Sequence, residues 1–173
     1  MAEKARPDKY ANYAIASLTE SAANTLTFKK LETGFSLFEK VAWIINRIEY
    51  WVQSVHATMF NGGDDTFYYG MSVSASFATA LITEATIIDY NALSREDIGT
   101  AASGFFIHRP FVKDFSTLPG GGILVPPSPL YLYGVGSSLN SAQSLSARIH
   151  YTMLSLSAED YIELENARRI LSS

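Results

Sequence analysis

The chain of 173 residues contains no cysteine, and a long part of it carries no charge. The absence of cysteine excludes disulfides, thiolate metal sites and cysteine nucleophiles. No Asp, Glu, Lys, Arg or His occurs from Phe115 to Ala147, a stretch rich in Gly, Pro, Ser, Leu and Tyr. Charge on surface loops favours solubility, so a long neutral stretch is typical of surface that packs against other protein. Two short strands joined by neutral turns would explain it equally well.

Other absences exclude further classes of protein. The formal net charge of −4 gives no electrostatic footprint for nucleic acid, and we expect no sequence-specific nucleic-acid binding. No apolar run approaches the roughly 20 residues that a membrane-spanning helix requires. The segment Met1–Asp8 has mixed charge and no apolar core, so we expect no signal peptide and a protein used without secretion.

Alternation of apolar and polar residues predicts an all-β fold. Large apolar groups occupy every second position of Phe67–Phe77 and of Ser144–Met153, which is the period of a strand with one buried face. Turn signals separate about eight strands in one domain, residues 1–173, with residues 1–23 as an N-terminal arm. This count predicts a single jelly-roll β-sandwich of antiparallel strands. The shorter predicted strands are Thr25–Leu31, Ala85–Tyr90, Phe105–His108, Ile123–Val125 and Leu130–Val135.

The segment Gly34–Val55 is ambiguous between helix and strand. Its apolar residues fit a helical stripe, and Ser36 with Glu39 has the pattern of a capping box. Its density of β-branched and aromatic residues instead favours a strand. We predict one helical turn near Ser36–Lys40, followed by a long strand from about Ala42 to Gln53.

Two segments place a serine before adjacent acids, the pattern of a helix N-terminus. Leu93–Ile98 predicts the start of a short helix within a loop. Ser157 predicts a longer helix from Ala158 to about Leu171, within the C-terminal segment 157–172. We expect this helix to pack across one end of the sandwich or against a neighbouring subunit.

No active site is evident in the sequence. His56, His108 and His150 are isolated and lack the spacing of metal ligands. The Gly63-Asp64-Asp65 tripeptide is explained by a turn before a strand. We therefore predict no catalytic residue, metal site or cofactor, and a protein that is not an enzyme.

Two stretches carry a resemblance to a viral family. Thr33–Tyr50 looks like the early strand region of capsid proteins from icosahedral prokaryotic viruses, and Ala147–Thr152 with the following helix is similar to their last strand and C-terminal helix. In size and layout the chain most resembles the small single jelly-roll major capsid proteins of membrane-containing, double-stranded-DNA phages of Thermus. The absence of cysteine suits such a thermophilic source.

The resemblance implies a structural capsid protein, located in the virion and made in the host cytoplasm. It implies a homo-oligomer, a dimer or larger, that co-assembles with a second, larger capsid protein, with the internal viral membrane as a further candidate partner. The alternative is a β-sandwich module that binds carbohydrate or another ligand through a solvent-facing Trp43 or Trp51. The subunit-contact candidates are Pro126, Pro127, Pro129, Leu130, Tyr131 and Tyr133, together with Tyr161 and Leu164 of the helix.

Overall fold

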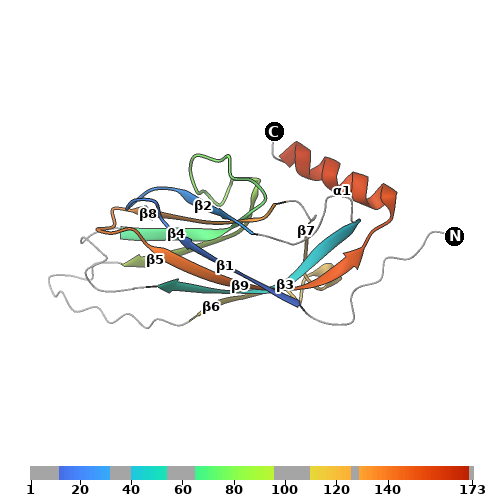
Figure 1. Cartoon of the computed structure of the whole chain (residues 1–173), viewed down its shortest axis with the longest axis horizontal. Coiled ribbons are helices and arrows are strands. Elements are labelled where there is room, and N and C mark those ends of the chain that lie inside the picture. Colours follow the sequence, from blue (N-terminus) through green and yellow to red (C-terminus); the bar gives the residue numbers. More distant parts are fainter. Residues whose placement is uncertain (1–11, 32–39, 54–64, 96–109, 126–128, 172–173) are drawn as a thin grey trace.

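The computed structural model of the chain describes residues 12–31, 40–53, 65–95, 110–125 and 129–171. Within these ranges the chain forms strands β1 to β9 and one C-terminal helix (Figure 1). The predictions of a helical turn near Ser36 and of a strand at Phe105–His108 lie outside the described residues. The elements are β1 Asn12–Thr19, β2 Thr27–Lys30, β3 Val41–Gln53, β4 Asp65–Ser72, β5 Ile87–Arg95, β6 Phe111–Asp114, β7 Ile123–Val125, β8 Tyr131–Ser137, β9 Ser144–Ser155 and α1 Ala158–Leu171.

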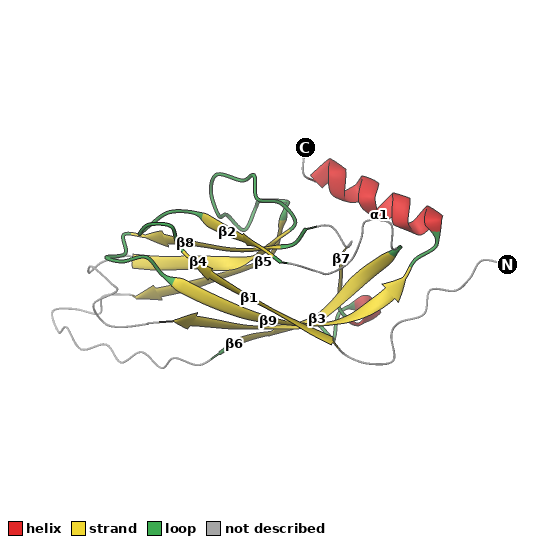
Figure 2. Cartoon of the chain, in the orientation of Figure 1, coloured by secondary structure: helices red, strands yellow, loops and turns green. Residues whose placement is uncertain are grey.

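The strands form two sheets that pack face to face (Figure 2). Sheet A has the order β1-β9-β3-β6, and β7 continues along the same edge of β3 as β6. Sheet B has the order β2-β8-β4-β5. Every pair of neighbouring strands is antiparallel.

This strand order is that of a single jelly roll. The chain runs as one long antiparallel ribbon, in which β1 lies opposite β9, β2 opposite β8, β3 opposite β6 and β7, and β4 opposite β5. Successive pairs of this ribbon fall alternately in sheet A and in sheet B. The predicted all-β jelly-roll sandwich with a short C-terminal helix is therefore confirmed.

The core lies between the two sheets. The geometry of β3 explains why the segment Gly34–Val55 was ambiguous between helix and strand. Trp43 and Ile45 point into the core, and so do Ile48 and Tyr50 further along the strand. The pairing with β9 shifts by one residue between Ile45 and Arg47, which marks a β-bulge. The bulge turns a step of two into a step of three, so the apolar spacing resembles that of a helix. The predicted strand is confirmed.

Two predicted boundaries were wrong. β4 ends at Ser72 and not at Phe77, because the Ser72 hydroxyl donates to the carbonyl of Ser74 (2.7 Å) and the chain leaves the sheet. β5 runs from Ile87 through Arg95, beyond the predicted end at Tyr90, so Ser94, the expected N-cap of a short helix, lies in a strand. The rest of that predicted helix lies outside the described residues. Leu93 instead pairs with Phe67 and packs against the core, so tertiary contacts override the local capping pattern.

Both ends of the described chain belong to regular elements. β1 lies within the stretch assigned to an arm, yet it pairs with β9 along its whole length. Helix α1 is confirmed, and its N-terminus is capped as predicted: the Asp160 N–H donates to Ser157 Oγ (3.1 Å), and that hydroxyl donates to the Asp160 carboxylate (2.7 Å). Figure 2 shows α1 at one end of the sandwich.

Candidate functional site

Two of the predicted contact residues lie inside the chain's own fold. Leu130 belongs to the core between the sheets. The Tyr133 ring is fully buried on the outer face of sheet B, where its hydroxyl donates to the Asp89 carbonyl (3.0 Å). Neither side chain is accessible to another subunit, which corrects their selection as contacts. At these two positions the absence of charge in Phe115–Ala147 is explained by burial within the chain's own fold.

The remaining candidates are distributed over separate places. Pro129 and Tyr131 are half-buried at the start of β8, and Tyr161 and Leu164 are half-buried on α1. Pro126 and Pro127 lie outside the described residues. The candidates that the structure describes therefore lie on two different elements, near the start of β8 and on α1.

The outer face of sheet B is covered by the chain itself. Between β4 and β5 the chain passes back over this face, and Phe77 and Ala80 become buried against Tyr133. The Phe77 ring meets Tyr133 edge-on at 5.3 Å and Phe28 at 4.8 Å. We call this second apolar layer, Phe28, Phe77, Ala80 and Tyr133, the sheet B cover.

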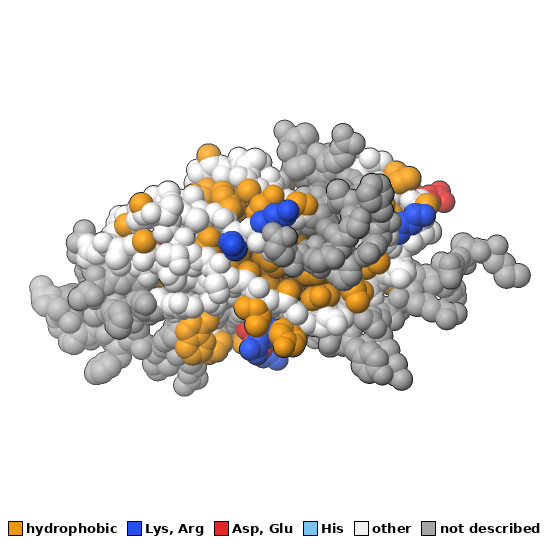
Figure 3. Space-filling model, viewed as in Figure 1, with side chains coloured by type: hydrophobic (Ala, Val, Ile, Leu, Met, Phe, Trp, Pro, Cys, Tyr) orange, Lys and Arg blue, Asp and Glu red, His pale blue; other side chains and the backbone are white. Residues whose placement is uncertain are grey.

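The outer face of sheet A presents bulky apolar side chains to solvent. Tyr13 is 65% exposed, Ile15 60% and Trp51 44%, and Val112 at the other edge is also exposed. The register aligns them in rows across the sheet, because Tyr13 lies opposite His150 and Ile15 opposite Arg148. Figure 3 shows hydrophobic side chains beside basic and acidic ones along the margin where Figure 1 draws sheet A.

Charges of both signs occupy the middle of this face. Glu49 contacts Arg47 (Oε1 to Nη2, 2.8 Å), His150 (Oε1 to Nε2, 3.5 Å) and Arg148 (Oε2 to Nη1, 3.8 Å). The Arg148 guanidinium also lies 5.8 Å from the Tyr13 ring centre, within cation–π range. Asp114 lies opposite Arg47 in the same row of the sheet. The described part of this face thus carries two arginines and two carboxylates, whose charges cancel when His150 is neutral.

Hydroxyl groups continue the face toward the turn end of β1. Ser17 and Ser146 share a hydrogen bond of 2.9 Å between hydroxyl oxygens, and Thr19 and Ser144 share another of 2.9 Å. Gln53 Nε2 donates to Ser146 Oγ (2.8 Å). These groups satisfy one another in the plane of the sheet, so they form a flat polar surface without charge.

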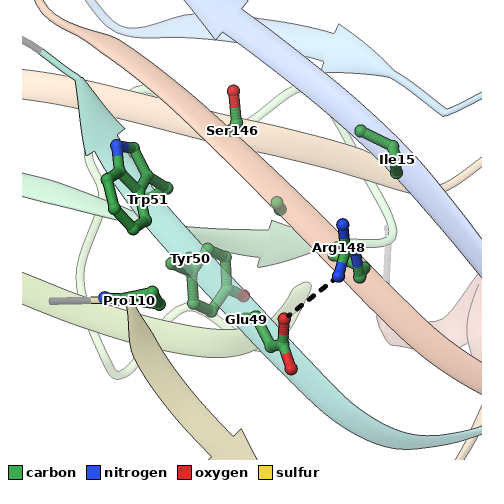
Figure 4. A pocket seen from close by; sticks show the side chains of 8 residues that line it. Ile15, Glu49, Tyr50, Trp51, Pro110, Ser146 and Arg148 are labelled. Atoms are coloured by element: carbon green, nitrogen blue, oxygen red, sulfur yellow. Dashed lines mark ion pairs between the residues drawn. The ribbon is translucent and has the colours of Figure 1, made fainter.

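A shallow pocket of about 320 Å³ lies in this face. Figure 4 shows the Glu49–Arg148 ion pair in the pocket, with Ile15 on one side and Trp51 on the other. Trp43, by contrast, is buried and stacks on Tyr151 at 3.8 Å between ring centres. Of the two tryptophans, Trp51 is the one that a ligand or a partner can reach.

Sequence reasoning missed this face. In β1 the large residues Tyr13 and Ile15 alternate with the small residues Ala14 and Ala16, and the small ones face the core. Bulky apolar residues on one side of a strand are normally assigned to the interior. Alternation alone does not say which side faces the core, and in β1 the small residues face it while the large ones lie outside.

The described part of the chain gathers no group of three or more His, Asp or Glu side chains that could hold a metal ion. None of its helices is long and apolar enough to span a membrane. Comparison with models of protein families finds no match for this chain, and comparison with curated protein sequences finds none either.

Proposed function

We propose that this protein is a structural capsid protein, which self-associates and co-assembles with a second, larger capsid protein to form an icosahedral virion shell. The observation that carries the proposal is a jelly roll with one outer face covered by its own chain and the other left exposed. Shell proteins need a rigid domain with sides that bind neighbouring subunits. The resemblance of the sequence to single jelly-roll capsid proteins supports the same function.

The composition of the exposed face supports binding to a second copy. An association surface between identical subunits must complement itself, and a neutral face that carries both arginines and carboxylates meets this condition. Tyr and Trp are the side chains most enriched at such surfaces, and Tyr13 and Trp51 both lie here.

The size of the face is also adequate for a weak, reversible contact. At a strand spacing of about 4.8 Å and about 3.3 Å per residue, three strands over the eight residues of β1, with the four residues of β6, present roughly 440 Å². Two such faces would bury about 900 Å², at the low end of interface sizes, where weak and transient contacts lie. We therefore expect association that depends on concentration, as for subunits that lock only within a complete shell.

Size-exclusion chromatography with light scattering, over a wide range of concentrations, tests the proposal. We expect a discrete dimer or larger oligomer whose fraction grows with concentration. Mixing with the second capsid protein should then give larger particles that electron microscopy resolves as capsomers. A monomer at every concentration, with or without a second capsid protein, would contradict the proposal.

The second candidate function is carbohydrate binding, and the pocket beside Trp51 favours it. An exposed indole next to Arg148, Glu49 and Ser146 offers a stacking surface with polar groups at its rim. Sugars should then quench the emission of Trp51, while buried Trp43 stays unchanged. The Trp51→Phe variant provides the control, because only Trp43 then emits. If a broad glycan panel leaves the emission of the wild type unchanged, this candidate is rejected.

A further inference from the structure

A polar cluster bridges the two sheets at the edge opposite β1 and β2. β5 is the last strand of sheet B, and β6 is the last strand of sheet A. The Asp89 side chain of β5 is 4% exposed, and its Oδ1 lies 3.2 Å from Nζ of Lys113 on β6. This ion pair connects the two sheets through their edge strands, β5 and β6.

The second oxygen of the same carboxylate holds an amide. Asn91, two residues along β5 from Asp89, donates from Nδ2 to Asp89 Oδ2 over 2.7 Å. Asn91 is buried, and within the described residues its Oδ1 accepts no hydrogen bond. A buried carbonyl without a donor carries a desolvation cost, so the cluster as it stands is polar but not satisfied.

The surroundings of the cluster are apolar and aromatic. Met71 pairs with Asp89 across the sheet, and both are buried. Burial, and then the nearby Asp89 carboxylate, raise the pKa of Tyr69 to about 12 and the pKa of Tyr50 well above its ordinary value. The Asp89 side chain is itself only 4% exposed, so its carboxylate lies in a poorly solvated place, where electrostatic effects on neighbouring groups are strong.

We propose that Lys113 and Asn91 form an intramolecular isopeptide cross-link, with Asp89 as the catalytic acid and base. The Lys113 amine is ion-paired with one buried carboxylate and the Asn91 amide donates a hydrogen bond to it, so Asp89 holds the nucleophile and the electrophile together. The lysine stem is flexible, so Nζ can approach the amide carbon while it remains in contact with Asp89. The proposal concerns the fold and does not depend on the proposed capsid function.

The reaction balances without any oxidant or co-reactant. The Lys113 ammonium gives a proton to Asp89, and the free Nζ attacks Cγ of Asn91. Rotation of the Asn91 amide lets Oδ1 accept a hydrogen bond from the protonated Asp89, which polarises the carbonyl. As the Nζ–Cγ bond forms, Nζ loses a second proton. The bond from Cγ to Nδ2 then breaks, and the nitrogen takes up that proton through Asp89 and leaves as ammonia. The proton that Asp89 first received leaves with the ammonia, as ammonium. Asp89 ends as the carboxylate, and the new secondary amide joins β5 to β6.

Asn91 is a better acceptor than Asp89 itself. An ionised carboxylate carries negative charge on the carbon that the amine would have to attack, whereas the amide carbonyl is neutral. Direct attack on Asp89 would also require a second acid to protonate it. Because an attack on Asp89 would release water rather than ammonia, the mass of the product distinguishes the two acceptors.

Intact-mass spectrometry of the denatured wild-type chain tests the proposal. Release of ammonia lowers the mass of the chain by about 17 Da relative to the mass calculated from its sequence. We expect this loss in the purified chain or, if the reaction is slow, after incubation at elevated temperature. Digestion should give one branched peptide that joins the Asn91 and Lys113 segments. The Lys113→Arg and Asp89→Ala variants should both keep the full mass, while the matched control Lys30→Arg should show the same loss as the wild type.

Two results would overturn the proposal. A wild-type chain with the full sequence mass after prolonged heating would show that no cross-link forms. A loss of about 18 Da would instead show that water left, and would overturn the choice of Asn91 as the group attacked by the lysine amine. Both results are read from the wild type alone, so they hold even if a variant fails to fold.

Discussion

On sheet B the chain supplies its own cover, whereas sheet A presents its largest apolar side chains to solvent. Phe77 and Ala80 pack on buried Tyr133, and Phe28 packs partly buried against the same cluster, so hydrophobic contacts on that side stabilise the monomer. On sheet A, Tyr13 stays 65% exposed, Ile15 60% and Trp51 44%, so these side chains contribute less to folding of the isolated chain. One face therefore contributes to stability and the other, in our proposal, to association.

The largest expected effect comes from Tyr133→Ala, which removes the central ring of the sheet B cover. Truncation of a fully buried aromatic side chain costs about 3–5 kcal/mol, and its hydrogen bond to the Asp89 carbonyl is lost as well. The free energy of unfolding, measured by urea denaturation, should fall by this amount. Tyr131→Ala, at a half-buried position of the same strand, provides the control and should cost much less. Equal losses would show that the cover does not stabilise the fold.

A change at Glu20 tests whether the two sheets are joined at one end. This buried carboxylate accepts hydrogen bonds from the backbone N–H groups of Gly136 (2.8 Å), Gln143 (2.7 Å) and Thr25 (3.2 Å). Glu20→Gln places an amide donor against these donors, and we expect a loss of about 2–4 kcal/mol in unfolding free energy. Exposed Glu159→Gln should change it by less than about 0.5 kcal/mol. A similar small change at Glu20 would contradict this role.

The buried tyrosines should ionise at higher pH than the exposed ones, which makes stability depend on alkaline pH. Burial, followed by the charge of Asp89, raises the pKa of Tyr69 from 10.0 to about 12 and also raises the pKa of Tyr133 in the sheet B cover. Above pH 10 the unfolded chain ionises these groups while the folded chain keeps them neutral. Stability should therefore be unaffected below about pH 10 and should fall as pH rises toward 12. Tyrosinate absorbance measures the ionisation, and circular dichroism over the same pH range measures the folded fraction. Ionisation of all tyrosines near pH 10 in a chain that stays folded would contradict the raised pKa values.

The smallest effect on stability is expected on sheet A. Ile15→Ser replaces a side chain that is 60% exposed, so it should lower the free energy of unfolding by about 1 kcal/mol or less, well below the loss in Tyr133→Ala. Urea denaturation at low protein concentration, where the chain is monomeric, provides the measurement. A loss as large as that of Tyr133→Ala would mean that this face already stabilises the isolated chain.

The elements that the sequence predicted correctly are those in which the side that looks buried from the local pattern is also the side that faces the core. β9 alternates regularly, and α1 begins with a capped turn, so both were placed well. β1 was missed because it directs its large residues outward, and the end of β4 was missed because Phe77 packs on the opposite face from Phe67. Alternation defines two sides of a strand but does not say which side faces the core. Pairing with distant strands decides that.

The exposed face was not predictable for the same reason. Tyr13 and Trp51 are far apart in sequence, and only the pairing of β1 with β9 and of β9 with β3 places them on one surface. The neutral stretch Phe115–Ala147 was expected to provide contacts, yet Leu130 and Tyr133 were needed inside the fold. Ser116–Gly120 of the same stretch are exposed, so absence of charge alone predicts neither burial within a chain nor burial between chains.

The most direct test of the account compares two isoleucine variants by light scattering across a concentration series. Ile15→Ser changes the exposed face of sheet A, while Ile82→Ser changes an isoleucine, 77% exposed, in the loop between β4 and β5. We expect Ile15→Ser to associate only at tenfold or higher protein concentration, a loss of at least about 1.4 kcal/mol, and Ile82→Ser to associate like the wild type. Equal association of all three proteins, or a loss confined to Ile82→Ser, would contradict it.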